Sequence, residues 1–409
     1  MQDHPQRTED REEDEAQIRP FRLRASDQEL ADLHARLDAA RLPERETVAD
    51  GADGADGTDG ADARSRWTQG VPLAELVDLV EHWRHGFDWR AFEARLDRLG
   101  QVVTRIDGLE IHALHRRSSR PDATPLLLTH GWPGSIVEHV HLIEELAEPS
   151  TEGAPAFHVV APSLPGFGLS GRPDEPGWGI ERIAHAWAEL MRRLGHDRFL
   201  AHGGDWGGPI TTILAGRHPE RVIGAHLTWA LGLPGHRPEV LDPVEARWAE
   251  ETRRFDEERL AYAKVMQSSP QTLGYALVDS PLALLAWLLE KIAEWSDWTA
   301  SPFDAVPRER VLENATLHWL TRTGASASRI YTESHARIDP ELTVDVPVAI
   351  TTYPRDIAKA PRVWAESRYH RIVRWAAPSR GGHFPSWEVP EAFVADLREG
   401  LADVLRAAG

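Results

Sequence analysis

The chain has 409 residues, a hydrophobic fraction of 41% and a net charge of −19, which is typical of a globular protein with a large core. The negative charge argues against nucleic acid as a partner, because phosphate binding needs a basic protein face. The absence of cysteine excludes disulfides, thiolate catalysis and cysteine-ligated metals.

The first hundred residues predict a disordered tail, 1–17, followed by a helical N-terminal segment, 18–100. The tail lacks the apolar middle of a secretion signal, and no run in the chain approaches the roughly 20 apolar residues of a membrane span. We therefore expect a cytoplasmic protein without a membrane anchor. An acidic Asp-Gly repeat lies within 47–64 and lacks the closing glutamate of a calcium loop, so it predicts a solvated loop.

Residues 101–230 and 336–409 alternate strand and helix patterns, which predicts an α/β fold with a mostly parallel sheet. The expected strands are Val102–Ile106, Leu109–Leu114, Pro125–Thr129, His158–Ala161, Asp197–His202, Val222–Leu227, Val346–Thr352 and Ile372–Ala376. The expected helices are Ser135–Leu146, Ile180–Leu194, an amphipathic Gly208–Ala215 and Glu391–Ala407. Residues 231–335 follow the sixth of these strands and show helical patterns only, which predicts an inserted cap.

The sequence GGDWGG at 203–208 sets Asp205 at a sharp turn between a strand and a helix. Small neighbours allow such a turn to expose one side chain, an arrangement called a nucleophile elbow. A serine there forms an acyl ester, whereas a carboxylate that attacks carbon forms an alkyl ester, which suits epoxides and alkyl halides. Taken alone, the pattern fits equally well a Gly-rich turn whose aspartate offsets a helix dipole.

A second Gly-rich turn, HGWPGS at 130–135, follows an apolar strand and opens a helix. Combined with the elbow, it predicts an oxyanion hole in which the backbone N–H groups of Trp132 and Trp206 hold the Asp205 oxygen that does not attack. As a purely structural element, the turn would cap the helix that begins at Ser135. The order of the two turns along the chain favours the functional interpretation.

The C-terminal part supplies candidates for a base and an acid. His383 stands in GGHF on the loop after the last strand, where the histidine of a nucleophile–acid–base order is expected. We favour Asp356, which follows the preceding strand, as the acid of this catalytic triad, and Glu366 lies near enough in sequence to compete. Trp287 in the cap and Phe384 beside the histidine are candidates for the substrate pocket.

These motifs, in this order behind a helical segment, resemble the microsomal-type epoxide hydrolases of the α/β-hydrolase superfamily. The resemblance runs from about Ile18 to the C-terminus. It implies an α/β-hydrolase fold with a helical cap inserted after the sixth core strand and a helical N-terminal segment. It also implies two cap tyrosines that donate to the epoxide oxygen, and by position these match Tyr262 and Tyr331.

The resemblance further implies that a hydrophobic epoxide and water become a vicinal diol through an alkyl ester on Asp205, with no metal or organic cofactor. The expected partners are therefore the epoxide and water, without nucleic acid or a membrane anchor, and a homodimer stays open. A haloalkane dehalogenase that uses the same aspartate is the nearest alternative. An inactive α/β-hydrolase that serves as a binding module is the alternative from another class.

Overall fold

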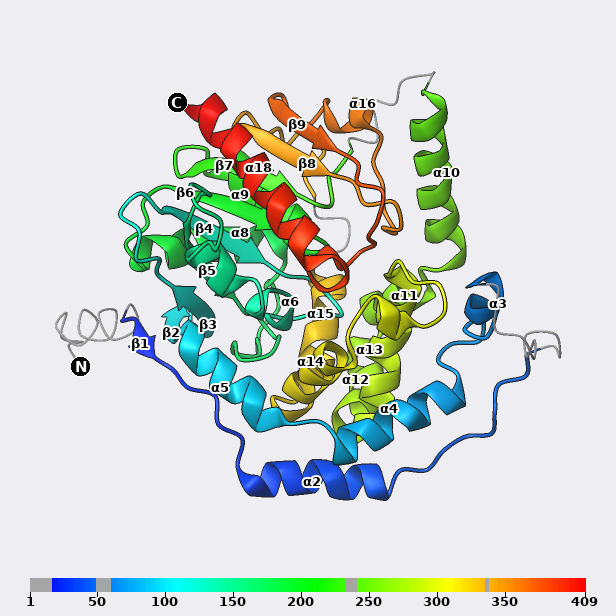
Figure 1. The fold of residues 1–409 in the computed structure, drawn as a ribbon. Helices are drawn as coiled ribbons and strands as arrows, with labels where there is room; N and C mark the ends of the chain where they lie inside the picture. Colours follow the sequence, from blue (N-terminus) through cyan, green and yellow to red (C-terminus); the bar gives the residue numbers. More distant parts are fainter. Residues whose placement is uncertain (1–16, 49–59, 233–240, 335–337) are drawn as a thin grey trace, which may run out of the picture.

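The computed structural model describes residues 17–48, 60–232, 241–334 and 338–409 (Figure 1). Within these ranges one 9-stranded sheet has the strand order β1-β2-β3-β5-β4-β6-β7-β8-β9. Pairing is antiparallel from β1 to β5 and parallel from β5 to β9. The strands are β1 Arg19–Pro20, β2 Gln101–Ile106, β3 Leu109–Arg116, β4 Thr124–Thr129, β5 Phe157–Pro162, β6 Phe199–Gly203, β7 Val222–Leu227, β8 Val348–Thr351 and β9 Ile372–Ala376.

This sheet confirms the mostly parallel α/β arrangement that the alternating patterns predict. The central strands β4 and β6 are apolar and almost fully buried, as is typical of parallel strands covered on both faces. The sequence missed β1, which adds to the sheet edge by pairing with Val102 and Val103. A strand of two residues is too short to show the alternation by which strands are recognised.

The helices around the sheet are α6 Val137–Val140, α7 Ile143–Ala147, α8 Ile180–Arg193, α9 Gly207–Arg217, α16 Arg362–Ala365, α17 Pro385–Glu388 and α18 Pro390–Ala408. The amphipathic character predicted for the helix after the elbow is wrong. Every residue of α9 from Gly207 to Ala215 is buried, because α9 packs between the sheet and α8. A helix enclosed on all sides has no solvent face to keep polar.

The single helix expected over Ser135–Leu146 is also wrong, because two short helices, α6 and α7, take its place. The break falls at His141 and Leu142. The ring of His141 hydrogen-bonds to the carbonyl oxygen of Ser386 in α17, far along the chain. The apolar spacing of this stretch suits one helix, whereas a tertiary contact holds the residue at which the helix stops.

Residues between β7 and β8 form helices alone in the described part of the chain. They are α10 Pro243–Glu258, α11 Ala261–Ser268, α12 Pro270–Asp279, α13 Pro281–Trp295, the short 3₁₀ helix η1 Pro302–Asp304, α14 Arg308–Leu320 and α15 Gly324–Ser334. In the view of Figure 1, α11 to α15 lie below the β8 and β9 end of the sheet, and α10 stands to the right of it. Among the described residues no single helix is long and apolar enough to span a membrane. Helices α12 and α13 reach that length and hydropathy only when taken together, and the pair is bent by 117°.

The N-terminal segment contains α2 Asp27–Asp38, α3 Gly60–Ser65, α4 Leu73–His85 and α5 Trp89–Leu99. It passes along the outside of the cap helices in Figure 1, where α2 contacts α13 and α5 contacts α14. The predicted tail lies outside the described residues except for residue 17, as does 49–59 of the predicted acidic loop. The end of that loop departs from the prediction, because α3 begins at Gly60. The domain boundaries inferred from the sequence stay a prediction.

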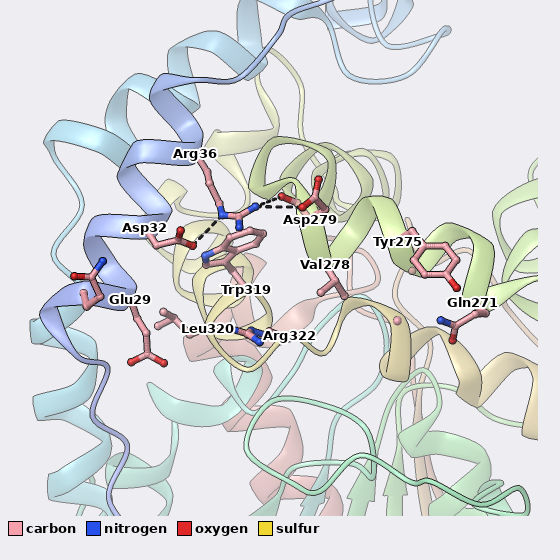
Figure 2. A pocket seen from close by; sticks show the side chains of 13 residues that line it. Glu29, Asp32, Arg36, Gln271, Tyr275, Val278, Asp279, Trp319, Leu320 and Arg322 are labelled. Atoms are coloured by element: carbon pink, nitrogen blue, oxygen red, sulfur yellow. Dashed lines mark hydrogen bonds and ion pairs between the residues drawn. The ribbon is translucent and has the colours of Figure 1, made fainter.

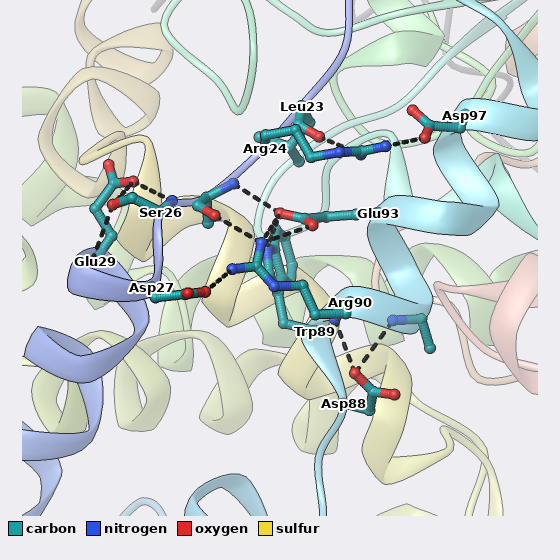
Figure 3. Close-up of polar contacts among 12 residues, drawn as sticks. Leu23, Arg24, Ser26, Asp27, Glu29, Asp88, Trp89, Arg90, Glu93 and Asp97 are labelled. Carbon is teal, nitrogen blue, oxygen red and sulfur yellow. Dashed lines mark hydrogen bonds and ion pairs between the residues drawn. The ribbon is translucent and has the colours of Figure 1, made fainter.

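A polar network ties the start of this segment to α5 (Figure 3). Glu93, which is 3% exposed, accepts hydrogen bonds from the backbone N–H of Ala25 and the indole N–H of Trp89. Arg90 donates to both oxygens of Glu93 and also pairs with Asp27 at the first turn of α2. The buried carboxylate is thus surrounded by donors, which offsets the cost of removing it from water.

Candidate active site

Asp205 lies at the sharp turn where β6 ends and α9 begins. Its φ of 45° is in the left-handed region, which non-glycine residues enter at a cost of about 1–3 kcal/mol and which is frequent at functional sites. The turn also brings backbones together, since a Cβ at Gly207 would overlap the carbonyl oxygen of Thr129 on β4. The glycines of GGDWGG therefore permit the strained turn that projects the Asp205 carboxylate.

One oxygen of Asp205 is held by the loop that follows β4. The backbone N–H of Trp132 donates to Asp205 Oδ1 over 2.8 Å. Trp206, the other predicted donor, directly follows Asp205, but its backbone N–H makes no hydrogen bond to Asp205 among the described residues. The structure thus brings Trp132 onto the carboxylate and leaves Oδ2 for another partner.

That partner is His383, on the loop between β9 and α17. Its Nε2 lies 3.2 Å from Asp205 Oδ2, and its Nδ1 lies 2.7 Å from Asp356 Oδ1. Asp356 follows β8 and also accepts the backbone N–H of Ile357, which fixes its carboxylate. Glu366, the competing acid, instead pairs with Arg362 at the surface. Asp205, His383 and Asp356, which lie far apart in the sequence, are therefore linked by direct side-chain contacts.

The electrostatics of this cluster centre on His383. Burial by itself would lower the pKa of His383, but the charge of Asp356 and the contacts with Asp205 outweigh it and raise this pKa to about 10. His383 is therefore an imidazolium near neutral pH. Removing the negative charge of Asp205 would remove part of the cause and lower the pKa of His383.

Tyr262 and Tyr331 come together over the aspartate, from α11 and α15. The Tyr262 ring stacks on Trp132 at 5.4 Å, and the Tyr331 ring meets Trp206 edge-on at 4.9 Å. The two tyrosine rings are 5.9 Å apart. Burial raises the pKa of both phenols, and the charge of Asp205 adds to the effect. Both groups are therefore neutral donors.

Of the two predicted pocket residues, the structure brings only Phe384 to this cluster. The Phe384 ring lies 4.9 Å from His383. Trp287 shows no ring contact with the cluster in the described part of the chain. Trp295, two helical turns further along α13, takes this place: its ring lies 5.0 Å from His383, and its carbonyl oxygen accepts the His383 backbone N–H. The sequence shows the tryptophans of this helix but not which one faces the histidine.

His130 and His202, which flank the two turns, are buried and hydrogen-bonded. His130 accepts from the backbone N–H of Leu164, and His202 pairs with His226. Within the described residues no group of three or more His, Asp or Glu side chains could hold a metal ion. The sequence-predicted site residues other than Trp287 and the competing acid Glu366 thus gather around Asp205.

A separate hollow of about 700 Å³ lies between α2, α12 and the α14–α15 junction (Figure 2). Arg36 lies over the Trp319 ring there and bonds to Asp32 and Asp279. Tyr275 stands at its edge and is 70% exposed. The lining of this hollow contains none of the predicted site residues, so the catalytic candidates and this surface feature are unrelated.

The chain resembles known proteins in both sequence and fold. A family model described as "Epoxide hydrolase N terminus" matches residues 18–139, and one described as "alpha/beta hydrolase fold" matches residues 124–269. The chain is 44% identical to a candidate epoxide hydrolase of Stigmatella aurantiaca over 93% of this chain and 84% of that protein. It is 31% identical to epoxide hydrolase 1 of Oryctolagus cuniculus over 94% of this chain and 88% of that protein.

Solved structures give the same picture for the fold. The Aspergillus niger epoxide hydrolase matches with a TM-score of 0.82 and 31% identity, covering 95% of this chain and 97% of that one. The juvenile hormone epoxide hydrolase of the silkworm Bombyx mori matches with a TM-score of 0.86 and 26% identity, covering 98% of each chain. The α/β-hydrolase fold expected from the sequence is therefore confirmed.

Proposed function

The chain belongs to the epoxide hydrolase family of the α/β-hydrolase superfamily and is an epoxide hydrolase, and on this premise we propose that it opens a hydrophobic epoxide through a covalent alkyl ester on Asp205. The product is a vicinal diol. The observation that supports this route is that the two oxygens of Asp205 have different partners: the backbone N–H of Trp132 donates to Oδ1, and His383 contacts Oδ2. The haloalkane dehalogenase and the binding module find no comparable support.

In the first step, Asp205 Oδ2 attacks an epoxide carbon from the side opposite the breaking C–O bond. Tyr262 and Tyr331 hydrogen-bond to the ring oxygen and protonate it as it leaves. An alkoxide is far more basic than a phenol, whose usual pKa is about 10, so proton donation lowers the barrier at about 1.36 kcal/mol per pKa unit. The phenol pKa values raised by burial support neutral, donor-competent tyrosines in the free enzyme.

In the second step, water attacks the ester carbonyl carbon, and His383 accepts the proton. Ester formation neutralises Asp205, whose contacts help to raise the pKa of His383 to about 10. The pKa of His383 therefore falls once the ester exists, and the imidazolium gives up a proton that replaces the one the tyrosines gave to the epoxide oxygen. The neutral ring, held by Asp356, can then act as a base. The backbone N–H of Trp132, joined by that of Trp206, stabilises the oxyanion, an effect typically worth about 3–4 kcal/mol per donor.

A hydrophobic substrate is supported by the surroundings of the nucleophile. Trp132, Trp295 and Phe384 are buried beside His383 and the tyrosines, and aromatic walls favour apolar ligands. A homodimer and a cytoplasmic location stay predictions from the sequence.

The test is mass spectrometry of the His383→Ala variant after exposure to aromatic and aliphatic epoxides, with Asp205→Asn as the matched control. We expect an adduct of epoxide mass on the Asp205 peptide in the first variant and none in the second. Diol formation at the wild-type rate by the Asp205→Asn protein would overturn the alkyl-ester route.

A further inference from the structure

A small cavity borders the reacting atoms on the side of the sheet. Its volume is about 20 Å³, and its lining includes Gly204, Asp205, Thr228, His383, Glu138 and His139. A cavity of this size has room for one water molecule when polar groups surround it. The walls here are polar, and they include both the carboxylate that would carry the ester and the base.

Glu138 on α6 is the residue of this lining that the mechanism does not use. It comes four residues after Gly134 in the HGWPGS turn, and its carboxyl occupies the place that a side chain at Gly134 would take, because a Cβ there would overlap Glu138 Oε1. The backbone N–H of Gly131 also acts on this carboxyl and lowers its pKa, against the larger effect of burial. The turn that presents Trp132 to Asp205 therefore also aims Glu138 at the cavity.

Burial and the charges around Glu138 shift the pKa of its carboxyl. Burial, followed by the nearby Asp205 carboxylate, raises the pKa of Glu138 to about 8, and the His383 charge opposes this. His139 and His202, the other titratable residues of the lining, are neutral near pH 7 because burial lowers their pKa values. Asp205 and His383 are thus the charged groups that Glu138 faces across the cavity.

We propose that Glu138 is a positioning residue that holds the hydrolytic water in this cavity for attack on the alkyl ester at Asp205. The inference rests on the proposed alkyl-ester route and adds a residue to its second step. The water donates one O–H to a Glu138 oxygen and the other to His383 Nε2. Its lone pair is thereby directed at Asp205 Cγ, the carbonyl carbon of the ester.

The step balances without a change at Glu138. A bond forms between the water oxygen and Asp205 Cγ, and the water proton passes to His383 Nε2. The tetrahedral intermediate then breaks the bond between Cγ and the alkyl oxygen, and His383 returns the proton to that oxygen as the diol leaves. This leaves Asp205 as a carboxylic acid, and its proton passes to His383 Nε2, which regenerates the carboxylate and the imidazolium. Water takes no part in ester formation, so the first step does not need Glu138.

The test is a rapid-quench experiment on Glu138→Gln with an aromatic epoxide, in which mass spectrometry follows the formation and decay of the Asp205 adduct. We expect ester hydrolysis to slow by about 10- to 100-fold, the range expected when a reactant is misplaced by about 1 Å, while ester formation stays within about threefold of wild type. In the steady state kcat and KM should fall together, because the adduct accumulates.

Two further variants separate this role from a structural one. Gly134→Ala, whose Cβ would displace the Glu138 carboxyl, should slow the same step. Glu93→Gln, at the buried carboxylate of the N-terminal network, should leave the ratio of the two rates unchanged in the folded protein. An unchanged hydrolysis rate in Glu138→Gln, or equal slowing of both steps, would overturn the proposal. Failure of the proposed function would differ, because the wild type would then form no adduct.

Discussion

Buried carboxyl groups occur in two regions of this protein that are built in opposite ways. In the N-terminal segment, Glu93 accepts hydrogen bonds from Ala25, Trp89 and Arg90 (Figure 3). Beside the sheet, Asp205 and Glu138 face one another across a small cavity and share the neighbouring charge of His383. The first carboxylate is surrounded by donors, whereas the second pair lines a cavity together with a charged histidine.

The difference teaches that burial alone does not mark a functional carboxylate; its partners do. A full set of donors stabilises one charge state and one geometry, which suits a structural joint. At the second site, burial and the Asp205 carboxylate raise the pKa of Glu138 to about 8, and Asp356 and Asp205 outweigh burial to raise the pKa of His383 to about 10. Such shifts are typical of sites where protons move.

The largest effect is expected from removing the nucleophile. Asp205→Asn should lower kcat by at least about 10⁴-fold, the scale typical of losing a catalytic nucleophile, with little change in thermal stability. Asparagine preserves the shape of the side chain and the acceptor for Trp132. Steady-state assays and a melting curve check both parts. Retained activity would mean that the Asp205 carboxylate is not the reacting group.

A smaller effect is expected from the phenols. The double variant Tyr262→Phe, Tyr331→Phe should slow ester formation by about 10²- to 10⁴-fold, the usual contribution of general-acid catalysis, and each single variant should lose less. Hydrolysis of the ester should be unaffected, because no epoxide oxygen remains to be protonated. Adduct formation in the His383→Ala background isolates the first step. Slower hydrolysis of a preformed adduct would contradict this division of roles.

The structural region should show the reverse phenotype. Glu93→Ala leaves the N–H donors of Trp89 and Ala25 without an acceptor, and we expect it to lower the free energy of unfolding by about 2–6 kcal/mol, at roughly 1–3 kcal/mol per unsatisfied buried group. Rates per folded molecule should not change. Denaturant titration with parallel activity assays makes the measurement. A loss of kcat without a loss of stability would contradict the purely structural role of Glu93.

The smallest effect is a dependence of stability on pH. The folded-state pKa of Glu138, about 8, lies above its ordinary value of 4.5, so its contribution is fully present below about pH 4.5 and is lost as pH rises through 8. The raised pKa of His383 acts in the same direction between about pH 6.5 and 10. Melting temperatures should therefore fall across this range, and less steeply for Glu138→Gln between pH 5 and 8. Parallel curves for both proteins would contradict the shift.

Much of the fold could be predicted because strands, turns and glycine positions leave local patterns. The strands after β1 lie within a few residues of their predicted places, and GGDWGG, HGWPGS and GGHF mark the loops that carry Asp205, Trp132 and His383. Loops at the carboxyl ends of neighbouring parallel strands meet at one edge of the sheet. The sequence therefore predicts the meeting of these residues before any coordinates are seen.

The tertiary structure decided which faces of the helices meet that edge. Trp287 and Trp295 belong to one helix and to one residue type, yet only the packing of α13 against the His383 loop selects Trp295. No sequence pattern points to Glu138, because its role depends on the space left by the missing side chain of Gly134 and on Asp205 across the cavity. Local patterns are set by near neighbours in the chain, whereas a helix face and a shared cavity are set by residues far apart in the sequence, such as Trp295 with His383 and Glu138 with Asp205.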